Sequence, residues 1–148
     1  MRKKIVLIIA VGALVMASAA ARVMAHHAFA AEFDANRPMF IKGTIAKIEW
    51  VNPHAWIHVA AEEITLAGET TKVSPPEVWM VEGGTPNTLL RRGLTRDTLS
   101  IGTPVVVDGF QAKDRSHRAN GRDITFPDGK KLFMGSSGTG APAAPPPP

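Results

Sequence analysis

The sequence predicts an all-β domain with one short helix, arranged as a small OB-like β-barrel in the order β-β-β-α-β-β. Three observations favour this fold class. Short apolar runs alternate with turn residues, a single helix-start signal lies between the third and fourth runs, and 148 residues provide one small domain. A helix between the third and fourth strands of a small barrel is the arrangement of the OB fold. Other all-β topologies stay open.

The first expected strand covers residues 39–51, where apolar side chains change faces near Ala46 and Lys47. That change predicts a bulge or a strong bend in one long strand, which the Asn52-Pro53 turn ends. A polar segment containing Pro75-Pro76 is expected to separate the second strand from the third. The later strands are expected at residues 55–60, 78–81, 105–110 and 122–126.

Thr85-Pro86 is typical of a helix start, with an N-cap threonine and proline at the first helical position. The expected helix ends at Gly93, since glycine favours helix termination. Asp128-Gly129 predicts a tight hairpin that leads into Leu132 and Phe133.

Residues 1–25 are typical of a secretory signal peptide. A positive segment, Arg2 to Lys4, precedes a 13-residue apolar run at 5–17, which is short for a membrane span of about 20 residues. Cleavage after Ala21 and cleavage after Ala25 both satisfy the small-residue rule, and an uncleaved anchor is the alternative. We expect export to the periplasm, with membrane contact only through the transient signal peptide.

The remaining chain divides into three parts by composition. Residues 26–37 form a leading N-terminal arm, residues 38–134 form the OB-like barrel domain, and residues 135–148 form a disordered tail rich in Gly, Ser and Pro. The tail lacks the apolar residues that a core needs.

Charge and composition exclude several functional classes. Four of the 17 basic residues and none of the 13 acidic residues lie before residue 26, so cleavage there leaves a neutral protein. A neutral domain has no net field to attract nucleic acid, and we expect no nucleic-acid partner. The absence of cysteine excludes thiolate metal sites and cysteine nucleophiles. Because no nucleophile-elbow, phosphate-loop or zinc-protease motif occurs, an enzyme is the less favoured class.

Several segments together resemble a known family. They are His26-His27-Ala28-Phe29-Ala30-Ala31-Glu32-Phe33-Asp34, Lys42-Gly43-Thr44, Glu49-Trp50-Val51-Asn52-Pro53-His54-Ala55-Trp56, Gly84-Thr85-Pro86-Asn87 through Gly93, and Ala112-Lys113-Asp114. The chain is similar in these motifs to DUF6152, a family of small exported bacterial proteins of unknown function. The resemblance implies that the double histidine and the Asn-Pro-His-Ala-Trp block are family features, and it implies no reaction.

Four histidines are the candidate metal ligands: His26, His27, His54 and His117. In OB-like barrels the loop between strands one and two and the loop between strands four and five flank the binding face, and these loops hold His54 and His117. Cleavage after Ala25 gives His26 a free amine beside its imidazole, and a third nitrogen then completes a set that suits Cu(II). Copper is therefore the candidate ion, with zinc and nickel as alternatives. His58 stands about 13 Å along the strand from His54, so we expect a half-buried or solvent-facing strand residue there.

The same loops supply candidate ligand-binding residues other than histidine. Trp50, Asn52 and Trp56 surround the first turn, and Arg115 lies in the last loop. Tryptophan faces stack on bases and sugars in OB folds, and arginine holds phosphate or carboxylate. The hypothesis is an exported periplasmic binding module for an unknown small ligand or metal ion. The alternatives are a polyanion- or oligonucleotide-binding OB-like domain and a domain that docks an envelope protein partner.

Overall fold

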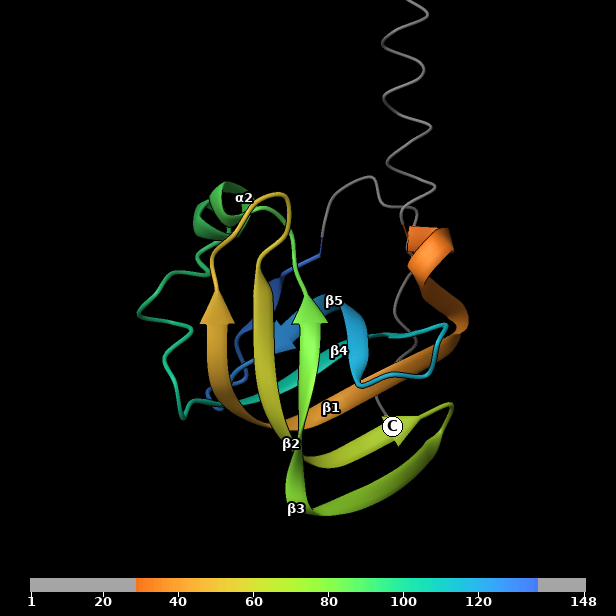
Figure 1. Cartoon of the computed structure of the whole chain (residues 1–148). Helices are drawn as coiled ribbons and strands as arrows, with labels where there is room; N and C mark the ends of the chain where they lie inside the picture. Colours follow the sequence, from red (N-terminus) through yellow and green to blue (C-terminus); the bar gives the residue numbers. More distant parts are fainter. Residues whose placement is uncertain (1–28, 136–148) are drawn as a thin grey trace, which may run out of the picture.

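The computed structural model describes residues 29–135, which form six strands and one short helix after a helical turn at 29–32 (Figure 1). The elements are β1 (Phe33–Glu49), β2 (Trp56–Leu66), β3 (Glu69–Glu82), α2 (Pro86–Arg91), β4 (Pro104–Ala112), β5 (Arg118–Thr125) and β6 (Lys131–Phe133). The prediction of an all-β domain with one short helix is confirmed. The expected signal peptide, His26, His27 and residues 136–148 of the expected tail lie outside the described residues.

The six strands form one sheet in the order β3-β2-β1-β4-β5-β6. A further pairing, the parallel contact of β3 with β5, joins strands from distant parts of this order. The hydrogen-bonded neighbours therefore make a closed circuit, β1–β2–β3–β5–β4 and back to β1. Figure 1 shows strongly curved strands, with β4 and β5 behind β1, β2 and β3.

β1 is a long strand that bends, as its sequence pattern predicts. Its pairing register with β2 shifts between Ile45 and Lys47, at the position where the apolar side chains change faces. A second shift lies between Lys42 and Gly43. Bulges increase local twist and curve a strand, so these two positions let β1 pair with β2 on one side and with β4 on the other.

The β2–β3 hairpin is longer than the sequence pattern predicts. We expected a polar segment between residues 60 and 78, but the two strands continue to a tight turn at Ala67 (φ 52°) and Gly68 (φ 90°). Pro75 and Pro76 are tolerated in β3 because they lie at an edge of the sheet. β5 pairs with β3 only from Met80 to Glu82, so within the described structure no strand pairs with that edge of β3 before Met80. The register with β2 also skips from Lys72 to Glu77, so residues 73–76 bulge out of the ladder.

The helix and the last hairpin are confirmed. The Thr85 side chain accepts a hydrogen bond from the Thr88 backbone N–H, and proline occupies the first turn of α2. Phe126 and Lys130 pair across the Asp128-Gly129 turn. β5 begins at Arg118, four positions before the expected start, because residues 118–120 pair with the end of β3.

The core consists of two apolar clusters. The larger one fills the interior of the curved sheet and includes Ile41, Ile57, Val81 and Val107, all almost fully buried. The smaller one joins the helical turn to the sheet through Phe29, Phe33, Phe110 and Ala112. The second cluster explains why β1 begins at Phe33 and not at the expected residue 39, since Phe33 is buried and pairs with Ala112.

Candidate functional site

The connection between β1 and β2 is held against the end of β3, and this fixes His54. The Ala55 N–H donates to the Gly84 carbonyl at 3.0 Å, and the Gly83 N–H donates to the Ala55 carbonyl at 2.8 Å. Nδ1 of His54 donates to the Gly83 carbonyl at 3.1 Å and lies 3.5 Å from Oε1 of Glu82. A histidine and a carboxylate that are 28 positions apart in sequence are thus neighbours.

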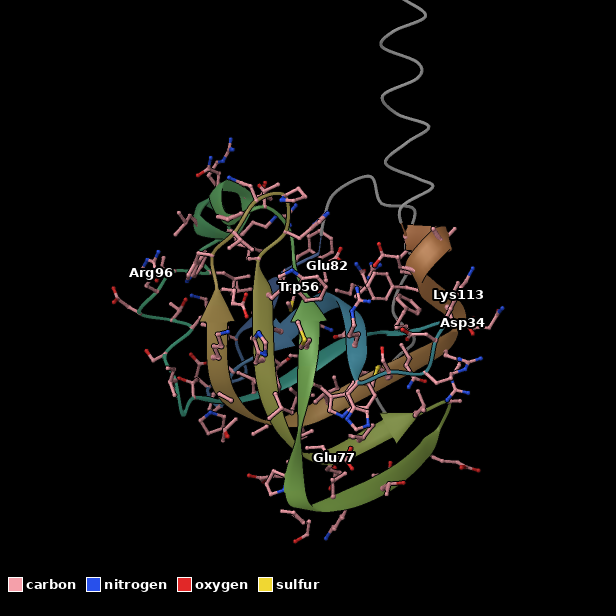
Figure 2. The ribbon with its side chains drawn as sticks, viewed as in Figure 1. Asp34, Trp56, Glu77, Glu82, Arg96 and Lys113 are labelled. Atoms are coloured by element: carbon pink, nitrogen blue, oxygen red, sulfur yellow. The ribbon has the colours of Figure 1, made fainter. Side chains whose placement is uncertain are left out.

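Glu82 is the buried polar centre of this region, with 8% of its surface exposed. It lies opposite Trp56 on β2 and opposite Asn120 on β5, and the Asn120 amide donates to Oε1 at 3.4 Å. Burial raises the pKa of the Glu82 carboxyl, and the nearby charges of His54 and Arg118 oppose this effect. In Figure 2, Trp56 and Glu82 lie side by side at the end of β3 that is nearer α2.

The helical turn at 29–32 is attached beside this centre. Glu32 accepts a hydrogen bond from Arg118 at 2.9 Å, and the Arg118 guanidinium lies 5.4 Å from the centre of the Trp56 ring. The negative charge of Glu32 also acts on Glu82. Phe29 packs edge-to-face against Phe110, with ring centres 5.5 Å apart, and so anchors the first described residue to β4.

His117 lies in the connection between β4 and β5 and packs against a different part of β3. Its ring stacks on Trp79 with a centre-to-centre distance of 4.8 Å, and its Nε2 lies 3.4 Å from Glu77. Trp79 and Glu82 are three strand positions apart, about 10 Å at strand rise. The structure therefore gives His54 and His117 separate partners. In Figure 2, Glu82 lies at the end of β3 and Glu77 lies further down the same strand.

The four predicted ligand-binding residues are divided among several surfaces. Trp56 lies beside Glu82, whereas Trp50 is covered by the Arg96 guanidinium at 5.5 Å and borders a small hollow of about 230 Å³. Asn52 is exposed, and Arg115 pairs with Asp34 at 3.2 Å. Only Trp56 of this group belongs to the region around His54.

His58 matches its expected character as a half-buried strand residue. Its side chain is 12% exposed, and Nε2 lies 2.9 Å from Oε1 of Glu49. The same carboxylate oxygen accepts a hydrogen bond from Lys47 at 2.6 Å. The Lys47 and His58 hydrogen bonds lower the pKa of Glu49, so this group is a carboxylate.

A second buried carboxylate lies across the sheet from the His54 region. Asp108 on β4 is 3% exposed and faces Asp123 on β5, and Lys131 on β6 lies 3.1 Å from the first carboxylate and 3.4 Å from the second. Burial raises the pKa of Asp108, and the hydrogen bond from Lys131 opposes the shift. This cluster fastens the short β6 strand to the sheet.

Sequence reasoning missed Glu82 and Asn120. The sequence did contain a signal for Glu82. This acidic residue directly follows the apolar run Val78 to Val81 and precedes Gly83-Gly84, which places a carboxyl group at the end of a buried strand. Asn120 carried none, since its role depends on the parallel pairing of β5 with β3.

Within residues 29–135, no group of three or more His, Asp and Glu side chains is placed to hold a metal ion. No helix in the described part of the chain is long and apolar enough to cross a membrane. A model of a protein family described as a family of unknown function, DUF6152, matches residues 13–121. No curated protein and no solved structure shows a significant match.

Proposed function

The chain belongs to the DUF6152 family, whose function is unknown, and from the geometry at His54 we propose that it is an exported periplasmic module that binds a divalent metal ion, with Cu(II) as the favoured ion. We further propose that its strands form an OB-like barrel. The closed circuit of strand pairings and the position of α2 between β3 and β4 support that architecture.

The orientation of the His54 ring carries the metal proposal. A carbonyl oxygen only accepts, so the bond to Gly83 places the Nδ1 proton on His54 and leaves the lone pair of the neutral ring at Nε2. Histidines that ligate metals usually donate their other ring N–H to a carbonyl or carboxylate, which fixes the tautomer and raises ligand basicity. His54 Nδ1 donates to the Gly83 carbonyl, and the Glu82 carboxyl group lies 3.5 Å from the same nitrogen.

The position of Phe29 supports His26 and His27 as the other proposed ligands. Phe29 packs on Phe110, which pairs with Asn120, and Asn120 pairs in turn with Glu82. Because β5 lies between β4 and β3, these two strands are two strand spacings apart, about 10 Å. His26 and His27 precede Phe29 by three and two residues, and an extended chain spans about 10 Å over three residues. We propose that one of these histidines, with the His26 amine after cleavage at Ala25, joins His54 Nε2.

Titration of the exported, processed protein with Cu(II) tests this proposal. Calorimetry should show that His54→Ala and the double variant His26→Ala/His27→Ala each weaken Cu(II) binding at least tenfold. Glu82→Gln should weaken it by about tenfold or more, because it alters the group beside the His54 ring. N-terminal sequencing of the same preparation determines whether His26 carries the free amine.

His117→Ala is the matched control, because it removes an imidazole that contacts Trp79 and Glu77 and not Glu82. We expect wild-type Cu(II) affinity in that variant. Equal affinity in wild type and His54→Ala would remove His54 from the site and refute the proposal. Recovery of the unprocessed protein in the cytoplasmic fraction would refute export.

A further inference from the structure

We propose that the outward face of β2 and β3 holds a second, chemically different metal site, in which His58 and Met80 bind the soft ion Cu(I). Neither His54 nor the N-terminal histidines belong to this site, so it can be tested independently of the function proposed above. Strand register, the hydrogen bond that orients His58 and the surroundings of the pair support it.

Strand register places the two ligands together. His58 and Met80 are directly opposite each other in the antiparallel pairing of β2 with β3. Opposed residues project from the same face of a sheet, with β-carbons about 4.5–5.5 Å apart. The neighbours Ile57, Val59 and Val81 are fully buried, so His58 and Met80 belong to the outward-facing set. Neither side chain is needed to fill the core.

Glu49 orients the imidazole for metal binding. A carboxylate only accepts, so Nε2 of His58 donates to Glu49, and the lone pair of the neutral ring is at Nδ1. Lys47 binds the same oxygen of Glu49 and holds the carboxylate in place. A histidine that donates one ring N–H to a carboxylate has the usual supporting geometry of a metal ligand.

The surroundings favour a soft, weakly charged ion. A thioether is a soft donor that selects Cu(I), and imidazole is acceptable to copper in either oxidation state. Three of the four next outward positions on the same strands are apolar or aromatic, namely Trp56 and Ala60 on β2 and Val78 on β3, and the fourth is Glu82 on β3. The neighbouring cations are neutralised, since Lys47 pairs with Glu49 and Arg118 pairs with Glu32. A half-buried imidazole–thioether pair with mostly apolar neighbours suits a monovalent copper ion, because the thioether is a soft donor.

Anaerobic competition with a chromophoric Cu(I) chelator measures the affinity of the processed full chain. We expect Met80→Leu and His58→Gln to lower Cu(I) affinity at least tenfold, and Glu49→Gln to lower it by about 10- to 100-fold. Leucine conserves the volume of methionine, so Met80→Leu should remain folded, which far-UV circular dichroism checks. Met39→Leu is the matched control, because Met39 is a core residue with 1% exposure, and it should leave the affinity unchanged.

A second measurement identifies the ligand atom directly. Ag(I) is an air-stable substitute for Cu(I), and one equivalent should shift the Met80 methyl resonance while the Met39 methyl resonance stays in place. An unmoved Met80 methyl signal, or wild-type Cu(I) affinity in Met80→Leu, would overturn the proposal. The two proposals fail separately, because Met80→Leu should not change Cu(II) affinity and His54→Ala should not change Cu(I) affinity.

Discussion

Gly43 lies where β1 bends, and replacing it with alanine should destabilise the protein severely. A β-carbon at this position would lie 2.1 Å from the Ala60 carbonyl oxygen, 2.8 Å from its carbonyl carbon and 2.9 Å from the Ala61 Cα. All three atoms belong to the backbone of β2, which is hydrogen-bonded to β1 on one side and to β3 on the other. A rotamer change cannot relieve the clash, so the strand itself must move.

The movement that Gly43→Ala requires determines how much stability is lost. Restoring ordinary contact with the Ala60 oxygen needs a displacement of about 1 Å at the centre of the sheet, and overpacking with backbone shifts costs typically about 1–3 kcal/mol. We expect a value at or above the upper end of that range, about 3 kcal/mol, because two strand pairings are disturbed together. For a domain of this size that loss lowers Tm by roughly 10 °C or more.

Urea unfolding followed by tryptophan fluorescence measures the free energy of unfolding, and Gly68→Ala is the matched control. Gly68 has φ 90°, and a β-carbon added there would meet no atom within 4 Å, so alanine suffers only backbone strain of about 1–2 kcal/mol. The reasoning is refuted if Gly43→Ala costs no more than Gly68→Ala.

Three further changes test the fold and the carboxylates. Burial raises the pKa of Asp108 above its ordinary 3.8. The folded state then binds that proton more tightly than the unfolded chain, so the contribution of Asp108 to the free energy of unfolding falls as the pH rises above 3.8. Asp108→Asn should remove this decline in a pH series of urea unfolding curves. Thr85→Ala removes the N-cap bond to Thr88 and should cost about 1 kcal/mol by the same assay, with no change at exposed Asn87→Ala. Phe29→Ala should lower the free energy of unfolding by about 3 kcal/mol and weaken Cu(II) binding, because it releases the helical turn at 29–32 from β4. Unchanged Cu(II) affinity in this variant would contradict the proposed role of that turn.

The features that the sequence predicted well are those with local causes. The bend in β1 followed from apolar side chains that change faces near Ala46, and the register shift lies there. The start of α2 followed from Thr85-Pro86, whose capping bond involves residues three positions apart. In both cases the physical cause lies within a few residues, so one sequence window contains it.

The features that were missed depend on distant contacts. Pro75 and Pro76 suggested a loop, but they are tolerated in β3 where no strand pairs with that edge in the described part of the chain. The neighbourhood of His54 and Glu82 depends on backbone bonds between Ala55 and Gly84, which no local pattern announces. The separation of His54 from His117 likewise follows from the partners that each ring meets on β3.

His54 and His58 lie on one short stretch of chain, yet their hydrogen bonds give them opposite tautomers in the neutral state. His54 donates from Nδ1 to a carbonyl, and His58 donates from Nε2 to a carboxylate. The lone pairs are therefore at different ring atoms, and Trp56 lies on the strand between the two residues. His54 lies in the connection before β2 and His58 lies on β2, and four residues of extended chain span about 13 Å. We therefore expect that a single ion does not bind both rings. If the chain binds copper through both histidines, we expect two ions. The nitrogen ligands that we propose to join His54 suit Cu(II), and the thioether opposite His58 suits Cu(I). A stoichiometry of one copper per chain under both oxidising and reducing conditions, abolished by a single histidine variant, would contradict this division.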